Sequence, residues 1–282
     1  MLTSVVWSAL YIASCGVRLA QLPSDPSDLD GLNLVSVNTS ASVERLTEQL
    51  AELIRKTPVV CDACEGEFKW QFIVGPGRSG TTTAMMMIDE IPGYYVTGEN
   101  KGLVNDLQEI FENTQSRLPS LTGALRRDGA ISEQHLLCAM QDLVRLSLGS
   151  FDEEHTTTIG FKEIRFETTE SMVFMQKLFP CAKYIVVTRR NPQLAVGSGW
   201  ITEENIFQMI NVSETLEAWQ GQNADIAFPL QLEDFSLKRF NDMLTWLGVT
   251  GCEYTHIAHS NKHGNYSDGR SQVRMNGTCV FS

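Results

Sequence analysis

Residues 75–83 carry the densest chemistry in the sequence, a glycine-rich loop that contains one cation and several hydroxyls. The loop follows the apolar run Phe72–Val74 and reads Gly75-Pro76-Gly77-Arg78-Ser79-Gly80-Thr81-Thr82-Thr83. A glycine loop between a buried strand and a helix start directs backbone N–H groups and the helix dipole at one point, where phosphate is the usual ligand. A simple left-handed turn is the alternative, but the arginine and the hydroxyls favour an anion site.

The spacing of Gly75 and Gly80 is that of a Walker A loop, yet Thr81 stands at the lysine position. A nucleoside-triphosphate kinase or ATPase needs that lysine on the β- and γ-phosphates. The cation of this loop is Arg78 instead. The loop therefore predicts anion binding and argues against an ordinary kinase.

Apolar runs and helical patterns alternate along the chain, and these elements must position the loop. The strands are expected at 72–74, 94–97, 157–161, 183–188 and 228–232. The helices are expected at 43–55, 81–90, 102–117, 132–148, 169–179, 214–223 and 237–247, with another that contains Ser198 and Trp200. This alternation predicts an α/β fold, a P-loop-like parallel sheet with helices on both faces and a site at the strand carboxyl ends. The tail from Gly251 gives no clear element.

Unusual polar residues follow four of the expected strands. They are Arg78 to Thr83, Glu99, Lys162 with Arg165, and Arg190 with Ser198. Each segment taken alone is compatible with a surface loop. Because parallel strands end at the same edge of a sheet, we expect these residues to meet in one crevice.

Two of these segments resemble the sulfotransferases that use 3'-phosphoadenylyl sulfate (PAPS), a family with a P-loop-like fold. Its first motif, [KR]-[ST]-G-[ST]-[ST], stands here as residues 78–82. Its second motif is an Arg-[DN]-Pro turn with a serine eight residues beyond the arginine. Arg190-Asn191-Pro192 and Ser198 match it, with Arg189 as the alternative register. The resemblance covers about residues 68–248.

The resemblance implies PAPS as the sulfate donor and no metal. It assigns donor binding to Arg78, Ser79, Gly80, Thr81, Thr82 and Thr83 around the 5'-phosphate, and to Arg190 and Ser198 at the 3'-phosphate. Arg78 would neutralise the bridging oxygen as the sulfuryl group departs. Two alternatives are a variant P-loop kinase and a non-catalytic nucleotide-binding module of the same fold.

A general base is needed for the acceptor hydroxyl or amine. Several secretory and bacterial family members place a glutamate after the second strand, where this chain has Glu99; an N-cap or ion-pair role is the alternative. Lys162 resembles a lysine that some luminal members carry near the base. A solvent-facing Lys162-Glu163 pair is the alternative. Arg165 either holds an acidic acceptor or is simply exposed.

The N-terminal segment predicts entry into the secretory pathway. Residues 1–17 carry no charged side chain, so we expect a signal peptide or short signal anchor at 1–20, with a lipoprotein signal at 12–15 as an alternative. A stem or linker at 21–67 and a sulfotransferase domain at 68–282 would follow. The expected location is the Golgi lumen or outside the cell, with membrane contact only through the N-terminal segment.

Sequons and cysteines agree with that compartment. The sequons begin at Asn38, Asn211, Asn265 and Asn276. Six cysteines besides Cys15 are compatible with disulfides, and a local bond between Cys61 and Cys64 is expected before the first strand.

The charge balance limits the partners. A net charge of −12 argues against a general nucleic-acid binder, because neutralising phosphates requires an excess of Lys and Arg. The expected partner is a hydroxyl-bearing acceptor, with carbohydrate favoured by the compartment and tyrosine or small alcohols behind it. In the tail, residues 263–270 are the segment most comparable to the loop that closes over the donor in cytosolic members.

Overall fold

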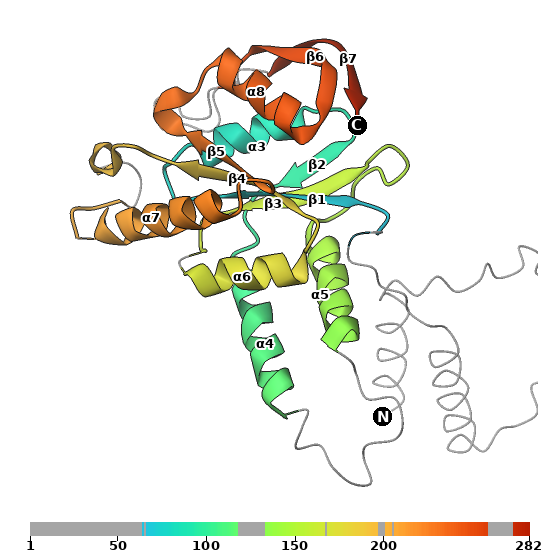
Figure 1. Cartoon of the computed structure of the whole chain (residues 1–282), viewed down its shortest axis with the longest axis vertical. Coiled ribbons are helices and arrows are strands. Elements are labelled where there is room, and N and C mark those ends of the chain that lie inside the picture. Colours follow the sequence, from blue (N-terminus) through green and yellow to red (C-terminus); the bar gives the residue numbers. More distant parts are fainter. Residues whose placement is uncertain are drawn as a thin grey trace, which may run out of the picture. The chain divides into compact units, whose positions relative to one another are not determined.

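The computed structural model describes residues 64, 66–117, 133–166, 168–196, 201–204, 206–258 and 273–282. Its centre is a five-stranded parallel sheet in the order β2-β3-β1-β4-β5, with helices on both faces (Figure 1). The strands are β1 (Lys69–Val74), β2 (Tyr94–Thr97), β3 (Thr158–Glu163), β4 (Lys183–Thr188) and β5 (Ala227–Gln231). This arrangement confirms the predicted α/β, P-loop-like fold class.

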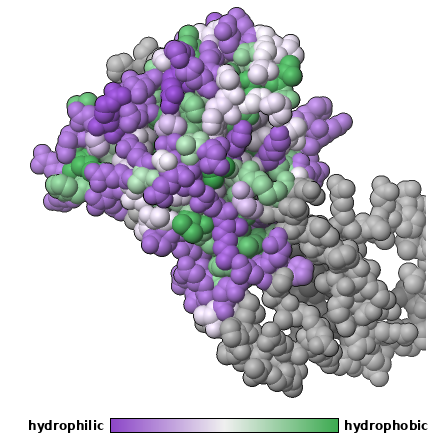
Figure 2. Space-filling model, viewed as in Figure 1, coloured by the Kyte–Doolittle hydropathy of each residue, from purple (hydrophilic) through white to green (hydrophobic). Residues whose placement is uncertain are grey.

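The helices occupy the connections between these strands. They are α3 (Thr81–Asp89), α4 (Leu103–Arg117), α5 (Glu133–Ser147), α6 (Thr169–Leu178), α7 (Ile206–Gln222) and α8 (Leu237–Leu247), with the short 3-10 helices η3 (Pro192–Ala195) and η4 (Leu232–Asp234). In Figure 1, α3 and α8 lie on one side of the sheet and α4 to α7 on the other. Figure 2 shows hydrophilic residues over most of the visible face, with hydrophobic residues in small separate patches.

The apolar run of β1 is buried on both faces, as a central parallel strand requires. Phe72 and Val74 belong to the core that includes residues of α4 to α7. Ile73, which points to the opposite face, belongs to the core formed with α3 and α8. Because β1 pairs with β3 on one side and β4 on the other, the segment after Val74 emerges between the ends of those two strands.

Most elements lie where the sequence predicts them. β2, β4 and α8 have the predicted bounds, while α7 begins at Ile206 instead of Glu214. The earlier start of α7 follows from buried side chains at helical spacing, including Ile206, Met209 and Val212. Ser198 and Trp200, expected in a helix, lie outside the described residues.

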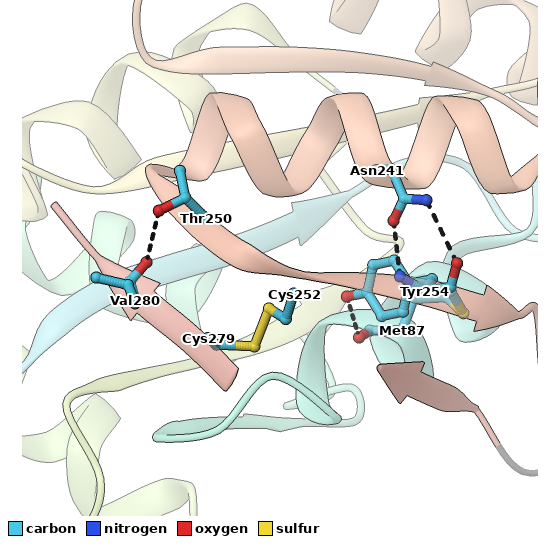
Figure 3. The surroundings of a disulfide bond; sticks show 7 residues. All are labelled: Met87, Asn241, Thr250, Cys252, Tyr254, Cys279 and Val280. Atoms are coloured by element: carbon cyan, nitrogen blue, oxygen red, sulfur yellow. Dashed lines mark hydrogen bonds between the residues drawn. A yellow bond between two sulfur atoms is a disulfide. The ribbon is translucent and has the colours of Figure 1, made fainter. Parts of the chain in front are cut away.

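The tail, for which no element was predicted, contains an antiparallel hairpin of β6 (Val249–His256) and β7 (Arg274–Phe281). A disulfide between Cys252 and Cys279 joins the two strands (Figure 3). The Tyr254 hydroxyl donates to the Met87 carbonyl at 2.6 Å, and the Tyr254 amide donates to the Asn241 side chain at 2.7 Å. The hairpin is thereby fastened to α8 and to α3, the helix that follows the glycine loop.

The predicted local disulfide between Cys61 and Cys64 is wrong. Cys64 bonds to Cys181, with 5.2 Å between their Cα atoms. The two cysteines precede β1 and β4, which are neighbours in the sheet, so strand order brings them together across 117 residues. Cys138 also forms a disulfide.

Several predictions concern residues outside the described ranges: the signal segment at 1–20, the helix at 43–55, all but the last residues of the stem, and the segment at 263–270. Within the described part of the chain, no helix is both long and apolar enough to span a bilayer.

We expect Gly75→Ala to lower the melting temperature because the new Cβ would stand 2.1 Å from the Val187 carbonyl oxygen. Forcing such a contact costs on the order of 1–3 kcal/mol. Gly221→Ala in α7 is the matched control, since nothing lies within 4 Å of its Cβ position. Thermal unfolding followed by circular dichroism compares the two variants. Equal melting temperatures would contradict the close approach of the loop to β4.

Candidate active site

The glycine loop between β1 and α3 adopts left-handed backbone conformations at two residues, Arg78 (φ 65°) and Gly80 (φ 92°). Ser79 between them is fully buried. Its hydroxyl lies 2.7 Å from the Pro76 carbonyl and 3.1 Å from the Val187 carbonyl. The Ser79 hydroxyl therefore holds the loop against the end of β4 through hydrogen bonds to backbone carbonyls of the protein itself.

Helix α3 begins directly behind this loop. Gly80 is its N-cap and supplies no side-chain hydrogen bond, and the Ala84 amide makes a 3.1 Å bond to the Gly80 carbonyl. The first N–H groups of a helix, here those of Thr81 and Thr82, have no intrahelical acceptor. A Cβ at residue 80 would lie 2.8–2.9 Å from the side chains of Leu232 and Phe235. The loop thus presents amide donors at the positive end of a helix dipole.

A second cluster of charge lies at the ends of β2 and β3, where the structure brings together Glu99 and Lys162. The Lys162 ammonium lies 2.5 Å from Glu99 Oε1, and Arg165 Nη1 lies 3.0 Å from Glu99 Oε2. Lys162 is 6% exposed and Glu163 is 1% exposed, so these two residues are not a solvent-facing pair.

The strand register explains why Glu99 meets these residues. β2 runs parallel to β3 with Thr97 opposite Phe161, so the chain two residues further places Glu99 alongside the end of β3. β1 pairs with the other side of β3, with Val74 opposite Glu163. The glycine loop and the Glu99 cluster consequently lie at the carboxyl ends of neighbouring strands.

Two opposed effects act on the Glu99 carboxyl. Partial burial raises the pKa of Glu99, but the hydrogen bond and charge of Lys162, followed by those of Arg165, outweigh it and hold the pKa below its usual value. Glu99 is therefore ionised at neutral pH. A carboxylate offers about four lone-pair positions, so two donors leave room for a further proton.

Glu163 is a part of this cluster that the sequence analysis missed as a site residue. Its carboxylate accepts from the Ile164 amide at 2.8 Å, from Arg165 Nη1 at 2.7 Å and from the Gly102 amide at 3.2 Å. It thereby holds Arg165 toward Glu99 and ties the segment after β2 to β3. The sequence feature that could have identified Glu163 was its place at the end of a predicted parallel strand, directly after Lys162.

The two arginines after β4 point to different partners. Arg189, the alternative register, places Nη1 3.3 Å from the Arg78 carbonyl of the glycine loop, and its side chain is 16% exposed. Arg190 is 58% exposed and places Nη2 2.8 Å from both carboxylate oxygens of Asp234. Ser198 lies outside the described residues, so the structure does not place it relative to Arg190.

Glu233 and Asp234 were also missed. The Glu233 carboxylate accepts from the backbone amides of Arg190 at 2.9 Å and Asn191 at 3.2 Å, and so orders the turn after β4. Both residues lie in η4, just after β5, so a search for polar residues beyond the end of each strand would have found them. Among the described residues, no cluster of three or more His, Cys, Asp or Glu side chains is arranged to hold a metal.

Fold and loop together define an α/β protein with a P-loop-like fold, in which the glycine loop and a glutamate–lysine pair lie at neighbouring strand ends. No family model and no curated protein matches the sequence. Among solved structures, the sulfotransferase domain of the Synechococcus PCC 7002 olefin synthase is 18% identical over 65% of this chain and 75% of that one, with a TM-score of 0.43.

Two further solved structures have lower scores. A sulfotransferase from Alicyclobacillus acidocaldarius is 17% identical over 64% of this chain and 81% of its own, with a TM-score of 0.37. A sugar kinase from Janibacter sp. HTCC2649 is 13% identical over 64% of this chain and 94% of its own, with a TM-score of 0.29. Such distant likenesses transfer no activity to this chain.

Proposed function

We propose that the protein is a sulfotransferase that moves the sulfuryl group of PAPS to a hydroxyl-bearing acceptor. The observation that supports this most is the placement of an arginine-bearing anion loop and the Glu99–Lys162 pair at neighbouring strand ends. The loop would stabilise the negative charge of the departing phosphate, and Glu99 would remove the proton of the acceptor. Sulfuryl transfer requires both in one crevice.

The loop fits the 5'-phosphosulfate end of PAPS. The uncapped start of α3 offers amide donors from Thr81 and Thr82, and a side chain at residue 75 or 80 would clash with neighbouring groups. Arg78 supplies the positive charge of the loop. At the 3'-phosphate we assign Arg190 together with Ser198, and a phosphate there would compete with Asp234 for the Arg190 guanidinium.

PAPS supplies an activated sulfuryl group. The protein's own side chains and amides accept the acceptor's proton and stabilise the charge left on the phosphate. Glu99 accepts the proton of the acceptor hydroxyl while the acceptor oxygen bonds to sulfur and the bond from sulfur to the phosphate oxygen breaks. Arg78 and the loop amides stabilise the negative charge left on that phosphate oxygen. Lys162 keeps Glu99 ionised and oriented.

For the compartment, we propose the secretory pathway, as the N-terminal segment predicts. The disulfides Cys64–Cys181 and Cys252–Cys279 support this proposal, because such bonds persist in oxidising compartments. The compartment taken alone favours a carbohydrate acceptor.

We expect adenosine 3',5'-bisphosphate (PAP), the product of PAPS, to raise the melting temperature, because a ligand that binds only the folded state stabilises it. Arg190→Ala should remove most of this shift, and it should leave the unliganded protein stable because Arg190 is largely exposed. Lys238→Ala, which removes another exposed cation paired with an aspartate, is the matched control. Differential scanning fluorimetry with and without PAP measures both effects.

Failure of PAP to stabilise the wild-type protein would overturn the proposed function. An unchanged shift in Arg190→Ala would leave the donor loop in place but remove Arg190 from the donor site. Stabilisation by ATP with phosphate transfer to an acceptor would instead support the kinase alternative.

A further inference from the structure

A cavity of about 340 Å³ opens beside the glycine loop, between the end of β3 and helix α7. Its lining consists of Pro76, Gly77, Ile164, Arg165, Gln208, Met209 and Val212. Pro76 and Gly77 belong to the loop, and Arg165 lies 3.0 Å from Glu99. The cavity therefore borders both the proposed donor loop and the residues around the proposed base.

Most of the described residues that line this cavity are apolar. Ile164, Met209 and Val212 provide aliphatic and thioether surface, and Met209 and Val212 are buried. Among the described residues of the lining, Arg165 and Gln208 carry the polar side chains. A sugar would bring several hydroxyls, and each one removed from water without a partner costs free energy. An apolar molecule would give up few hydrogen bonds with water on entering the cavity.

The charged cluster that includes the lining residue Arg165 is balanced in itself. Two carboxylates, Glu99 and Glu163, accompany two cations, Lys162 and Arg165. Arg165 Nη1 contacts both carboxylates, at 3.0 Å and 2.7 Å. An anionic acceptor would have to displace one of these carboxylates or enter unpaired, which is costly away from water. This argues for a neutral acceptor.

We propose that this cavity binds the acceptor, and that the acceptor is a small neutral phenol or alcohol with a compact apolar body and its hydroxyl at the Arg165 side of the cavity, next to Glu99. The proposal rests on the proposed sulfotransferase function and names its substrate class. The volume is compatible, because small-molecule sites span roughly 300–1,000 Å³. The lining residues therefore favour a different acceptor from the carbohydrate that the compartment alone would favour.

The first test measures binding of 2-naphthol by its own fluorescence, without any turnover. Gln208→Trp places a bulky ring at the exposed edge of the cavity, and we expect 2-naphthol to bind at least roughly tenfold more weakly, as for other steric changes in small pockets. Gln222→Trp is the matched control, an exposed glutamine of the same helix that does not line the cavity. PAP stabilisation should be equal in both variants.

The second test measures transfer of labelled sulfate from PAPS to 2-naphthol and to N-acetyllactosamine. We expect transfer to 2-naphthol, with KM raised in Gln208→Trp and unchanged in Gln222→Trp. Absence of saturable 2-naphthol binding, equal binding by the two variants, or transfer to N-acetyllactosamine alone would overturn the proposal. Intact 2-naphthol binding without PAP stabilisation would support the ligand class and overturn the transfer reaction instead.

Discussion

Glu99→Gln should reduce sulfuryl transfer by roughly 10²- to 10⁴-fold, the usual contribution of a general base. Glutamine has the shape of glutamate, and its amide oxygen can still accept from Lys162, which lies 2.5 Å from the carboxylate. It cannot take the acceptor's proton. We therefore expect kcat to fall while PAP stabilisation stays unchanged.

The measurement is a transfer assay at saturating PAPS, with the melting temperature recorded for each variant. Glu253→Gln is the control, because Glu253 is an exposed carboxylate on β6 away from the cluster. Since the pKa of Glu99 is held below its usual value, the wild-type rate should fall only as the pH drops below the ordinary glutamate range. Equal rates for Glu99→Gln and wild type would show that Glu99 is not the base.

Removing the Arg78 side chain should lower kcat by roughly 10²- to 10³-fold, the usual effect of losing one group that stabilises developing negative charge. Arg78 is the cation of the glycine loop, and its backbone has a φ of 65°. Alanine at this position would remove the charge and keep the backbone strain that arginine already carries there. Arg78→Gly is the better variant, because glycine adopts this conformation without strain.

The matched variant is Arg78→Lys, which keeps the charge but loses the planar guanidinium. We expect Arg78→Lys to retain part of the activity and Arg78→Gly to retain very little, with similar melting temperatures. Single-turnover kinetics at saturating PAPS separate the chemical step from donor binding. Wild-type transfer by Arg78→Gly would remove Arg78 from the charge-stabilising role.

Local pattern was enough to predict the glycine loop, the strands of the parallel sheet and most of the helices between them, but not the β6–β7 hairpin. The buried run of β4 and the amphipathic pattern of α8 (Leu237–Leu247) depend on side-chain periodicity within one segment, and both have the predicted bounds. The left-handed conformation of Gly80 likewise follows from turn chemistry over a few residues. Such short-range preferences act before the chain chooses its neighbours.

The partners of the charged side chains needed the tertiary structure. Adjacent strands of the sheet are far apart in sequence, and the order β2-β3-β1-β4-β5 decides which strand ends meet. That order brings Glu163 to the Gly102 amide and Cys64 to Cys181. It also decides that Arg189 faces the loop while Arg190 reaches Asp234 beyond β5.

The sequence by itself therefore determined the glycine loop without the kinase lysine, and it predicted anion binding there and candidate base and phosphate residues at later strand ends. Only the tertiary structure decided that Glu99 is held by Lys162 and Arg165, and that Arg165 also lines a cavity beside the glycine loop. The physical reason is the separation along the chain of the residues that interact. Helix, strand and turn preferences act over a few residues, whereas ion pairs and cavities form between segments that strand order brings together.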